Sequence, residues 1–208
     1  KETFQNNNWF SKNDIKYNNI VELDNLHGYV LPHASTKYTG NIISHTLRFK
    51  PVKKFDTVFI IYFPFSEYKN VDNQYYHEYY VPYMSINHVI SKYWNITNPI
   101  NYIGIDLRKK NKINLDKIKV SNSLIILSVD FSHNLNQSIA LELEDKAAHS
   151  LMFRRLEENL YNNIIDHKIS FKYLYKHIHD NYQFQWIGRT RSPGSLGNKG
   201  VGYLSFLL

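Results

Sequence analysis

The fold is decided by the stretch Leu124–Ile125–Ile126–Leu127–Ser128–Val129–Asp130–Phe131–Ser132–His133. Five large apolar residues in its first six positions predict a strand that is buried on both faces, as strands of a parallel sheet are. Asp130 and His133 follow, and both residue types can carry out acid–base chemistry. In open α/β sheets, ligands bind beyond the carboxyl ends of the strands. We therefore expect Asp130 and His133 to lie at a functional edge of the sheet.

A second stretch, Tyr29–Val30–Leu31–Pro32–His33–Ala34, has the same layout of an apolar run followed by a histidine. The carboxyl ends of parallel strands meet at one edge of a sheet. The two stretches therefore predict that His33 and His133 line a common site.

Strands and helices alternate along the chain, which predicts a single α/β domain with a central, mostly parallel sheet flanked by helices. We expect strands at residues 28–31, 57–62, 100–105, 124–129, 183–187 and 201–207, and helices at residues 39–49, 75–94, 139–160 and 171–179. The last two strands are expected to form a hairpin. Residues 1–25 are polar and rich in asparagine, so we interpret them as an N-terminal arm that precedes the α/β domain at residues 26–208.

The composition excludes several classes of protein. Cysteine is absent, which excludes disulfides, thiol catalysis and thiolate metal ligands. No apolar run is long enough to span a bilayer, so we expect no membrane segment. These observations leave the compartment open, with a cytoplasmic location favoured. The net charge of +7 comes mostly from lysine, and short runs such as Lys53–Lys54 are interpreted as solvated loops, with a nucleic-acid partner as the weaker alternative.

Two further groups of side chains have alternative interpretations. His77, beside Glu78, either lies on the surface or lines the site. Arg189 and Arg191, in the predicted hairpin, either face solvent or meet an anion.

Three segments, in the same order along the chain, resemble signature motifs of the Memo family, whose fold is that of the class III extradiol dioxygenases. Residues 31–40 read Leu-Pro-His-Ala-Ser-Thr-Lys-Tyr-Thr-Gly, similar to Pro-His-Ala-Gly-x-x-Tyr-Ser-Gly, with a serine in place of the usual glycine. Residues 128–133 resemble Ser-Ser-Asp-Phe/Leu-Ser-His. Residues 192–206 are similar to the closing Ser-Gly-Asp and Val-Gly-Tyr-Ala segments, and a fainter match covers residues 78–83. The resemblance implies the α/β fold of that family.

The resemblance also implies a metal site, onto which this chain maps in part. His33 matches the family's first histidine ligand. The histidines that should follow the second strand are replaced by Phe63–Pro64–Phe65–Ser66–Glu67, where Glu67 falls near a ligand position. The family's cysteine is missing, and Glu144 or Asp145 falls near its place. The implied metal ligands are therefore His33, Glu67 and Glu144.

By the same resemblance, His133 matches the histidine that related dioxygenases use as a catalytic base, and Asp130 is expected to orient a loop or a histidine. The favoured function is a degenerate Memo-like protein that has largely lost its metal and acts as a binding or structural subunit with other protein subunits. The alternative is a metal-dependent redox protein or dioxygenase-like enzyme that holds one iron or copper ion and uses His33 and His133. Whether the protein is an enzyme stays open on these grounds.

Overall fold

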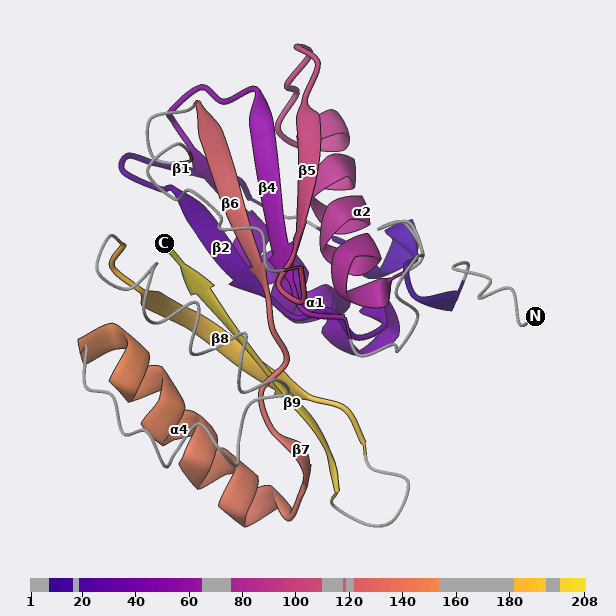
Figure 1. The fold of residues 1–208 in the computed structure, drawn as a ribbon, viewed down its shortest axis with the longest axis vertical. Helices are drawn as coiled ribbons and strands as arrows, with labels where there is room; N and C mark the ends of the chain where they lie inside the picture. The colour runs from indigo at the N-terminus through magenta and orange to yellow at the C-terminus, as the bar shows by residue number, and fades with distance from the viewer. Residues whose placement is uncertain are drawn as a thin grey trace.

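A mixed sheet of seven strands forms the centre of the protein, in the order β5-β4-β6-β2-β9-β7, with β8 paired to β9 beside this path (Figure 1). The computed structural model describes residues 8–16, 19–64, 76–109, 118, 122–153, 182–193 and 199–208. The parallel strands are β2 (Gly28–Leu31), β4 (Thr57–Tyr62), β5 (Asn101–Asp106) and β6 (Ser123–Ser128). The antiparallel strands β7 (His133–Leu135), β8 (Gln185–Arg191) and β9 (Gly200–Leu207) continue the sheet beyond β2. A separate parallel pair consists of β1 (Val21–Leu23) and β3 (Phe49–Pro51).

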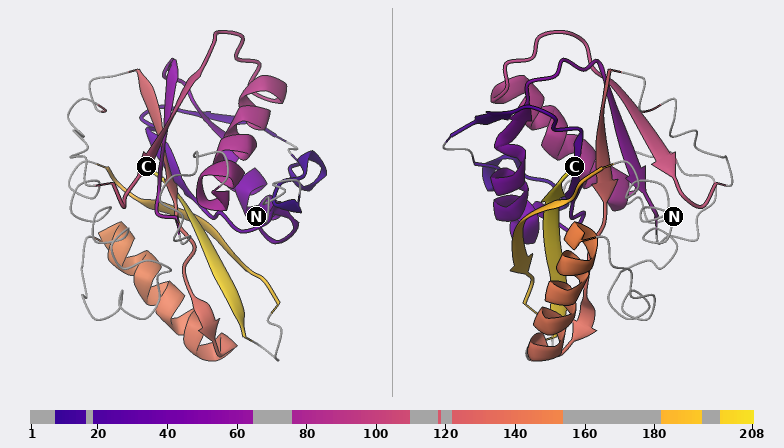
Figure 2. Two further views of the ribbon diagram at one scale, coloured as in Figure 1. Left: turned by 45° about the vertical axis from the view of Figure 1, so that its right-hand side comes forward. Right: turned by 90° about the vertical axis from the view of Figure 1, so that its left-hand side faces the viewer.

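Helices cover both faces of the sheet. α1 (Thr36–Leu47) and α2 (His77–Lys92) lie together on one side of the parallel strands (Figure 2). α4 (Gln137–Phe153) packs against β8 and β9. Within the described part of the chain, helices of the length and apolar character that a bilayer crossing requires are absent.

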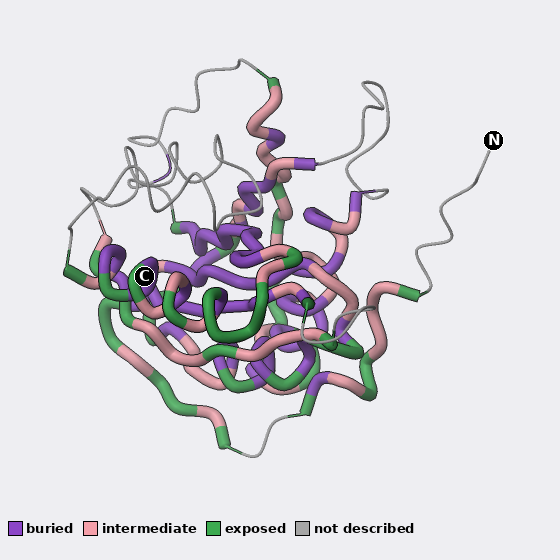
Figure 3. The backbone as a smooth tube through the Cα atoms, turned by 90° about the horizontal axis from the view of Figure 1, so that it is seen from below, coloured by how far each residue is buried: buried purple, intermediate pink, exposed green. Residues whose placement is uncertain are grey.

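Strand β6 is buried on both faces, as its sequence predicts. Leu124 and Ile126 belong to the core that contains residues of α1 and α2, whereas Ile125 and Leu127 belong to the core that contains residues of α4. Successive residues of a strand point to opposite faces, so alternate residues divide between the two cores. Figure 3 shows the burial of each residue along the backbone, with buried segments running through the middle of the molecule.

The predicted α/β architecture with parallel central strands is confirmed. The strands expected at residues 28–31 and 57–62 match β2 and β4. The helix expected at residues 171–179, and the end of the helix expected at residues 139–160, lie outside the described residues. The prediction missed β1, β3 and β7, because a strand of three residues is too short to show an alternating pattern.

Part of the N-terminal stretch expected as a polar arm packs onto the sheet and helices. A short 3-10 helix, η2 (Lys12–Asp14), lies beside α1, and the next residue, Ile15, is buried with 1% of its surface exposed. β1 also falls in this stretch.

The parallel strands bring four chain segments to one edge of the sheet, called here the carboxyl edge. β2, β4, β5 and β6 end there, at Leu31, Tyr62, Asp106 and Ser128. A hydrogen bond from the Ser128 hydroxyl to the carbonyl oxygen of Glu78 places the first turn of α2 at the same edge. This is the edge at which open α/β sheets bind ligands.

Candidate functional site at the carboxyl edge

His33 is held at the carboxyl edge by Asp130, in the segment that follows β6. The backbone nitrogen of His33 donates a hydrogen bond to Asp130 Oδ1 at 2.9 Å, and its ring Nε2 lies 3.6 Å from Asp130 Oδ2. Both side chains are buried. Pro32 directly follows β2 and has no N–H group to continue the strand's hydrogen bonding, so His33 leaves the strand beside the end of β6.

Ser128 connects the His33 ring to the start of α2 by a relay of two hydrogen bonds. The Ser128 hydroxyl lies 2.9 Å from His33 Nδ1 and donates its one proton to the carbonyl oxygen of Glu78, at 2.5 Å. Since that proton is already used, His33 Nδ1 must be the donor toward Ser128. The hydrogen bonds therefore favour a proton on Nδ1, while Nε2 is the ring nitrogen that lies near the Asp130 carboxylate.

A second histidine and a second carboxylate enter from the start of α2. His77 Nε2 lies 3.4 Å from Glu78 Oε1, and the rings of His77 and His33 meet edge to face with their centroids 5.4 Å apart. Glu78 is buried, whereas about a third of the His77 side chain is exposed. We call His33, His77, Glu78, Ser128 and Asp130 the histidine cluster.

An ion pair lies on the same edge of the sheet. Arg108 donates to both carboxylate oxygens of Asp106, at 3.1 and 2.8 Å, and to the hydroxyl of Tyr76, at 3.1 Å. Burial raises the pKa of the adjacent Tyr62 hydroxyl well above its usual range, and the negative charge of Asp106 adds to this effect. Sequence reasoning missed Asp106, although it directly follows a predicted strand as Asp130 does.

The predicted site residues do not all come together. Asp130 joins His33, as expected of a residue that orients a histidine. His133 opens β7, where it pairs with Val201 of β9 and is half-buried. Glu67 lies outside the described residues. The base role of His133 stays a prediction.

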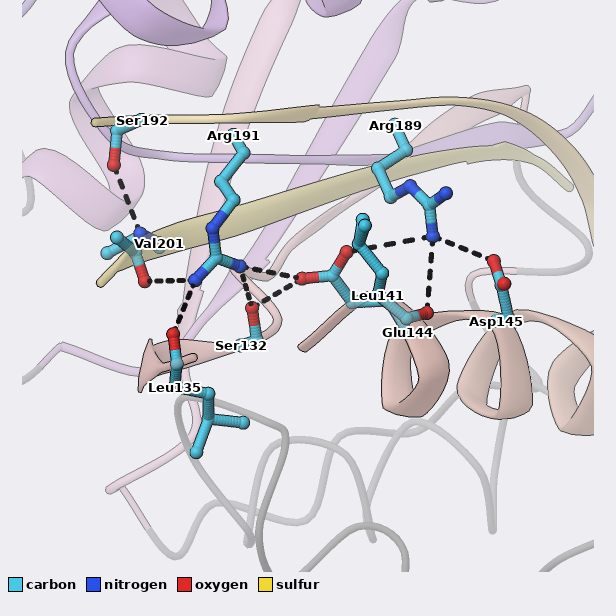
Figure 4. A network of polar contacts seen from close by, with 10 residues as sticks. Ser132, Leu135, Leu141, Glu144, Asp145, Arg189, Arg191, Ser192 and Val201 are labelled. Atoms are coloured by element: carbon cyan, nitrogen blue, oxygen red, sulfur yellow. Dashed lines mark hydrogen bonds and ion pairs between the residues drawn. The ribbon is translucent and has the colours of Figure 1, made fainter. Parts of the chain in front are cut away.

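Glu144 belongs to a different network, which ties α4 to β8 (Figure 4). Its carboxylate accepts hydrogen bonds from the Ser132 hydroxyl and from Arg191 Nη1, the latter at 3.3 Å, and lies 3.9 Å from Arg189 Nη1. Arg189 also binds Asp145, at 2.7 Å. The two arginines thus meet anions, namely carboxylates of this chain.

Arg191 is the centre of the network. Its Nη2 donates to the carbonyl oxygens of Leu135, at 2.9 Å, and Gly200, at 3.1 Å, while its Nη1 donates to the Ser132 hydroxyl, also at 2.9 Å. Burial raises the pKa of Glu144, and this effect outweighs the opposing effects of Ser132 and the two arginines. The planar guanidinium therefore joins the segments of β7, β9 and α4 around one buried acid.

Two of the three implied metal ligands lie in the described ranges, and each has its own ion-pair partner there: His33 lies beside Asp130, and Glu144 beside Arg191. Within the ranges that the structure describes, no group of three or more histidine or acidic side chains is arranged to hold an ion. Glu144 faces two guanidinium groups, whose positive charge opposes binding of a cation. The ligand set of His33, Glu67 and Glu144, with iron or copper, stays a prediction.

His77 is the residue of the cluster that sequence reasoning left undecided. The available signal was its place beside Glu78, at the start of a predicted helix that follows a strand of the parallel sheet. Such helix starts lie at the carboxyl edge.

No protein-family model matches this chain. A comparison with curated proteins also finds no match, so the resemblance to the Memo family stays a prediction from the sequence motifs.

Proposed function

We propose that the protein is a divergent Memo-like binding protein, in which the histidine cluster takes a small ligand through an ionisable hydroxyl group and His33 accepts the hydroxyl proton. The observation that supports this proposal is the relay from His33 Nδ1 to Ser128 and the Glu78 carbonyl. A histidine with one nitrogen committed as a donor has the other as a defined proton acceptor.

The neighbouring carboxylates suit this role. When Nε2 takes a proton, the Asp130 carboxylate 3.6 Å away stabilises the imidazolium. The hydrogen bond from the His33 backbone keeps that carboxylate in place. His77 is the partly exposed member of the cluster, so the ligand is expected to approach beside it. The proposal assigns no role to a metal ion.

The experiment uses 4-nitrophenol, whose phenolate absorbs visible light while the phenol does not. The wild-type protein is expected to bind the probe and raise its phenolate fraction. His33→Gln should abolish this rise, and Asp130→Asn should weaken it roughly tenfold, the effect of one pKa unit. His45→Ala, which removes an exposed histidine of α1, is the matched control.

Equal phenolate formation by wild type and His33→Gln contradicts the proposal. A second measurement does not depend on any variant. Long-range 15N–1H spectra of the wild-type histidines should show His33 protonated at Nδ1 at a pH where the imidazole is neutral, and an Nε2–H tautomer would contradict the relay. Metal analysis of the same sample tests the alternative function, which requires about one iron or copper ion per chain.

A second function, binding of single-stranded RNA, is favoured by a hollow at the opposite edge of the sheet. The hollow has a volume of about 530 Å³ and is bordered by Lys50, Lys53 and Lys54, with Asn98 and Asn122 among its other residues. Lys53 and Lys54 are exposed and attract phosphate groups, whereas Lys50 pairs with Glu22 at 2.8 Å. The slope of the logarithm of the RNA-binding constant against the logarithm of salt concentration reports the number of phosphate contacts. Changing Lys53 and Lys54 to glutamine should reduce this slope by the equivalent of about two contacts, and Lys37→Gln on α1 should leave it unchanged. An unchanged salt dependence in the double variant would exclude this function.

A further inference from the structure

The chain before β1 is docked along α1 by several hydrogen bonds. The backbone nitrogen of Thr36, the first residue of α1, donates to the carbonyl oxygen of Trp9 at 2.9 Å. The Thr36 hydroxyl in turn accepts from the backbone nitrogen of Ser11, at 2.9 Å, and donates to Asp14 Oδ2, at 2.8 Å. The Trp9 carbonyl thus satisfies an N–H group that the start of a helix leaves without an intrahelical partner.

Gly40 allows this segment to lie close to the helix. A Cβ atom at Gly40 would lie 2.5 Å from the carbonyl oxygen of Asp14 and 2.8 Å from its Cβ atom. Any larger residue would therefore push the segment away from α1. Further along, the backbone nitrogen of Lys16 donates to the Ser44 hydroxyl at 3.0 Å. These contacts fix the position of the backbone on both sides of η2.

The docked segment places Trp9 against the histidine cluster. Its ring stacks on His77, with a centroid distance of 4.4 Å and an angle of 11° between the planes. His77 in turn meets His33 edge to face. The His77 ring therefore contacts both the indole of Trp9 and the ring of His33.

We infer that Trp9 is a positioning residue of the ligand site: its indole holds the His77 ring in the orientation that faces His33, so residues 8–16 form part of the site. The expected effect of Trp9 on ligand affinity rests on the proposed function, whereas its effect on the His77 ring does not. A stacked aromatic pair restricts the histidine to one rotamer, which lowers the entropy lost when a ligand binds beside it.

The test compares two neighbouring aromatic residues. Trp9→Ala should move the His77 ring-proton signals downfield in the ligand-free protein, because the stacked indole no longer shields them. Phe10→Ala is the matched control. The Phe10 ring meets the ring of His88 edge to face, with their centroids 6.3 Å apart, and His88 is not a member of the histidine cluster. It should move the His88 signals and leave those of His77 in place. Trp9→Phe should restore most of the His77 shift.

Binding of 4-nitrophenol gives the second measurement. Trp9→Ala should weaken it roughly two- to tenfold, the range expected for loss of one aromatic pair, and Phe10→Ala should not. Unchanged His77 signals in Trp9→Ala would overturn the inference. A shifted His77 signal with an unchanged affinity for 4-nitrophenol would overturn it as well. Failure of the wild type to bind the probe overturns the proposed function instead, while the ligand-free spectra still test the position of His77. Trp9→Leu, which keeps an apolar side chain without a ring, replaces Trp9→Ala if that variant does not fold.

Discussion

The backbone nitrogen of His33 donates to the carboxylate of Asp130 at 2.9 Å, although 97 positions separate the two residues in the chain. One carboxylate thus holds the segment that leaves β2 against the segment that leaves β6. This bond has a structural role as well as the proposed chemical one, and the two can be separated by substitution.

Asp130→Ala should lower the free energy of unfolding by about 1–3 kcal/mol, because it leaves the buried N–H group of His33 without its acceptor. Asp130→Asn should cost less, since the amide oxygen can still accept that bond. Urea denaturation measures both. Asp56→Ala, at an exposed acid, should change the free energy by no more than about 0.5 kcal/mol. An equal loss in the alanine and asparagine variants would show that charge, rather than the bond to the backbone, stabilises the edge.

Glu144 should make the protein less stable as the pH rises just above 4.5. Burial raises its pKa in the folded state above the value of 4.5 that it has when unfolded. In this window the folded state binds more protons, so the free energy of unfolding falls with increasing pH. Glu144→Gln should remove this slope. The measurement is the difference in the free energy of unfolding between wild type and variant at several pH values above 4.5. A difference that does not change with pH would contradict the raised pKa of Glu144.

His88 should make the protein less stable as the pH falls below 6.5, which is the opposite of the effect of Glu144. Its ring is buried between Phe10 and Tyr93, and its pKa is lowered by burial first and by the charges of Lys92 and Lys12 second. Below pH 6.5 the unfolded state binds more protons, so stability is lost as the pH falls. His88→Phe keeps an aromatic ring without the titrating group. It should flatten this loss in urea denaturation, and a variant as acid-sensitive as wild type would disprove the role of His88.

Gly202→Ala should disrupt the network around Arg191. A Cβ atom at this position of β9 would overlap the carboxylate of Glu144 and lie 2.5 Å from the Ser132 hydroxyl. We expect a loss of about 1–3 kcal/mol in the free energy of unfolding. Adding Glu144→Ala removes the group that clashes, so the double variant should lose less than the sum of the two single losses. Simple additivity would show that the clash is relieved elsewhere.

Local patterns in the sequence were sufficient for the central strands and for Asp130. The apolar run from Leu124 marks a strand buried on both faces, and the rule that ligands bind at strand ends places His33 and Asp130 at one edge. The position of His77 depends on how α2 docks against β6, which no local pattern contains. The same is true of Trp9, which lies in a polar stretch without periodicity. Glu144 has the spacing of a core position of α4, but its arginine partners come from β8, 45 or more positions away (Glu144 to Arg189 and Arg191).

The relay through Ser128 has a consequence for the order of folding. Its two bonds join residues 95 and 50 positions apart, and the link to Asp130 spans 97. Contacts between such distant positions form after the local ones, because closing long loops costs entropy before any contact compensates for it. The tautomer of His33 is therefore defined only once β2, β6 and the first turn of α2 have all docked. Hydrogen exchange should find that the amide of His33 opens in the same cooperative unit as the start of α2, so that the site is gained or lost as a whole.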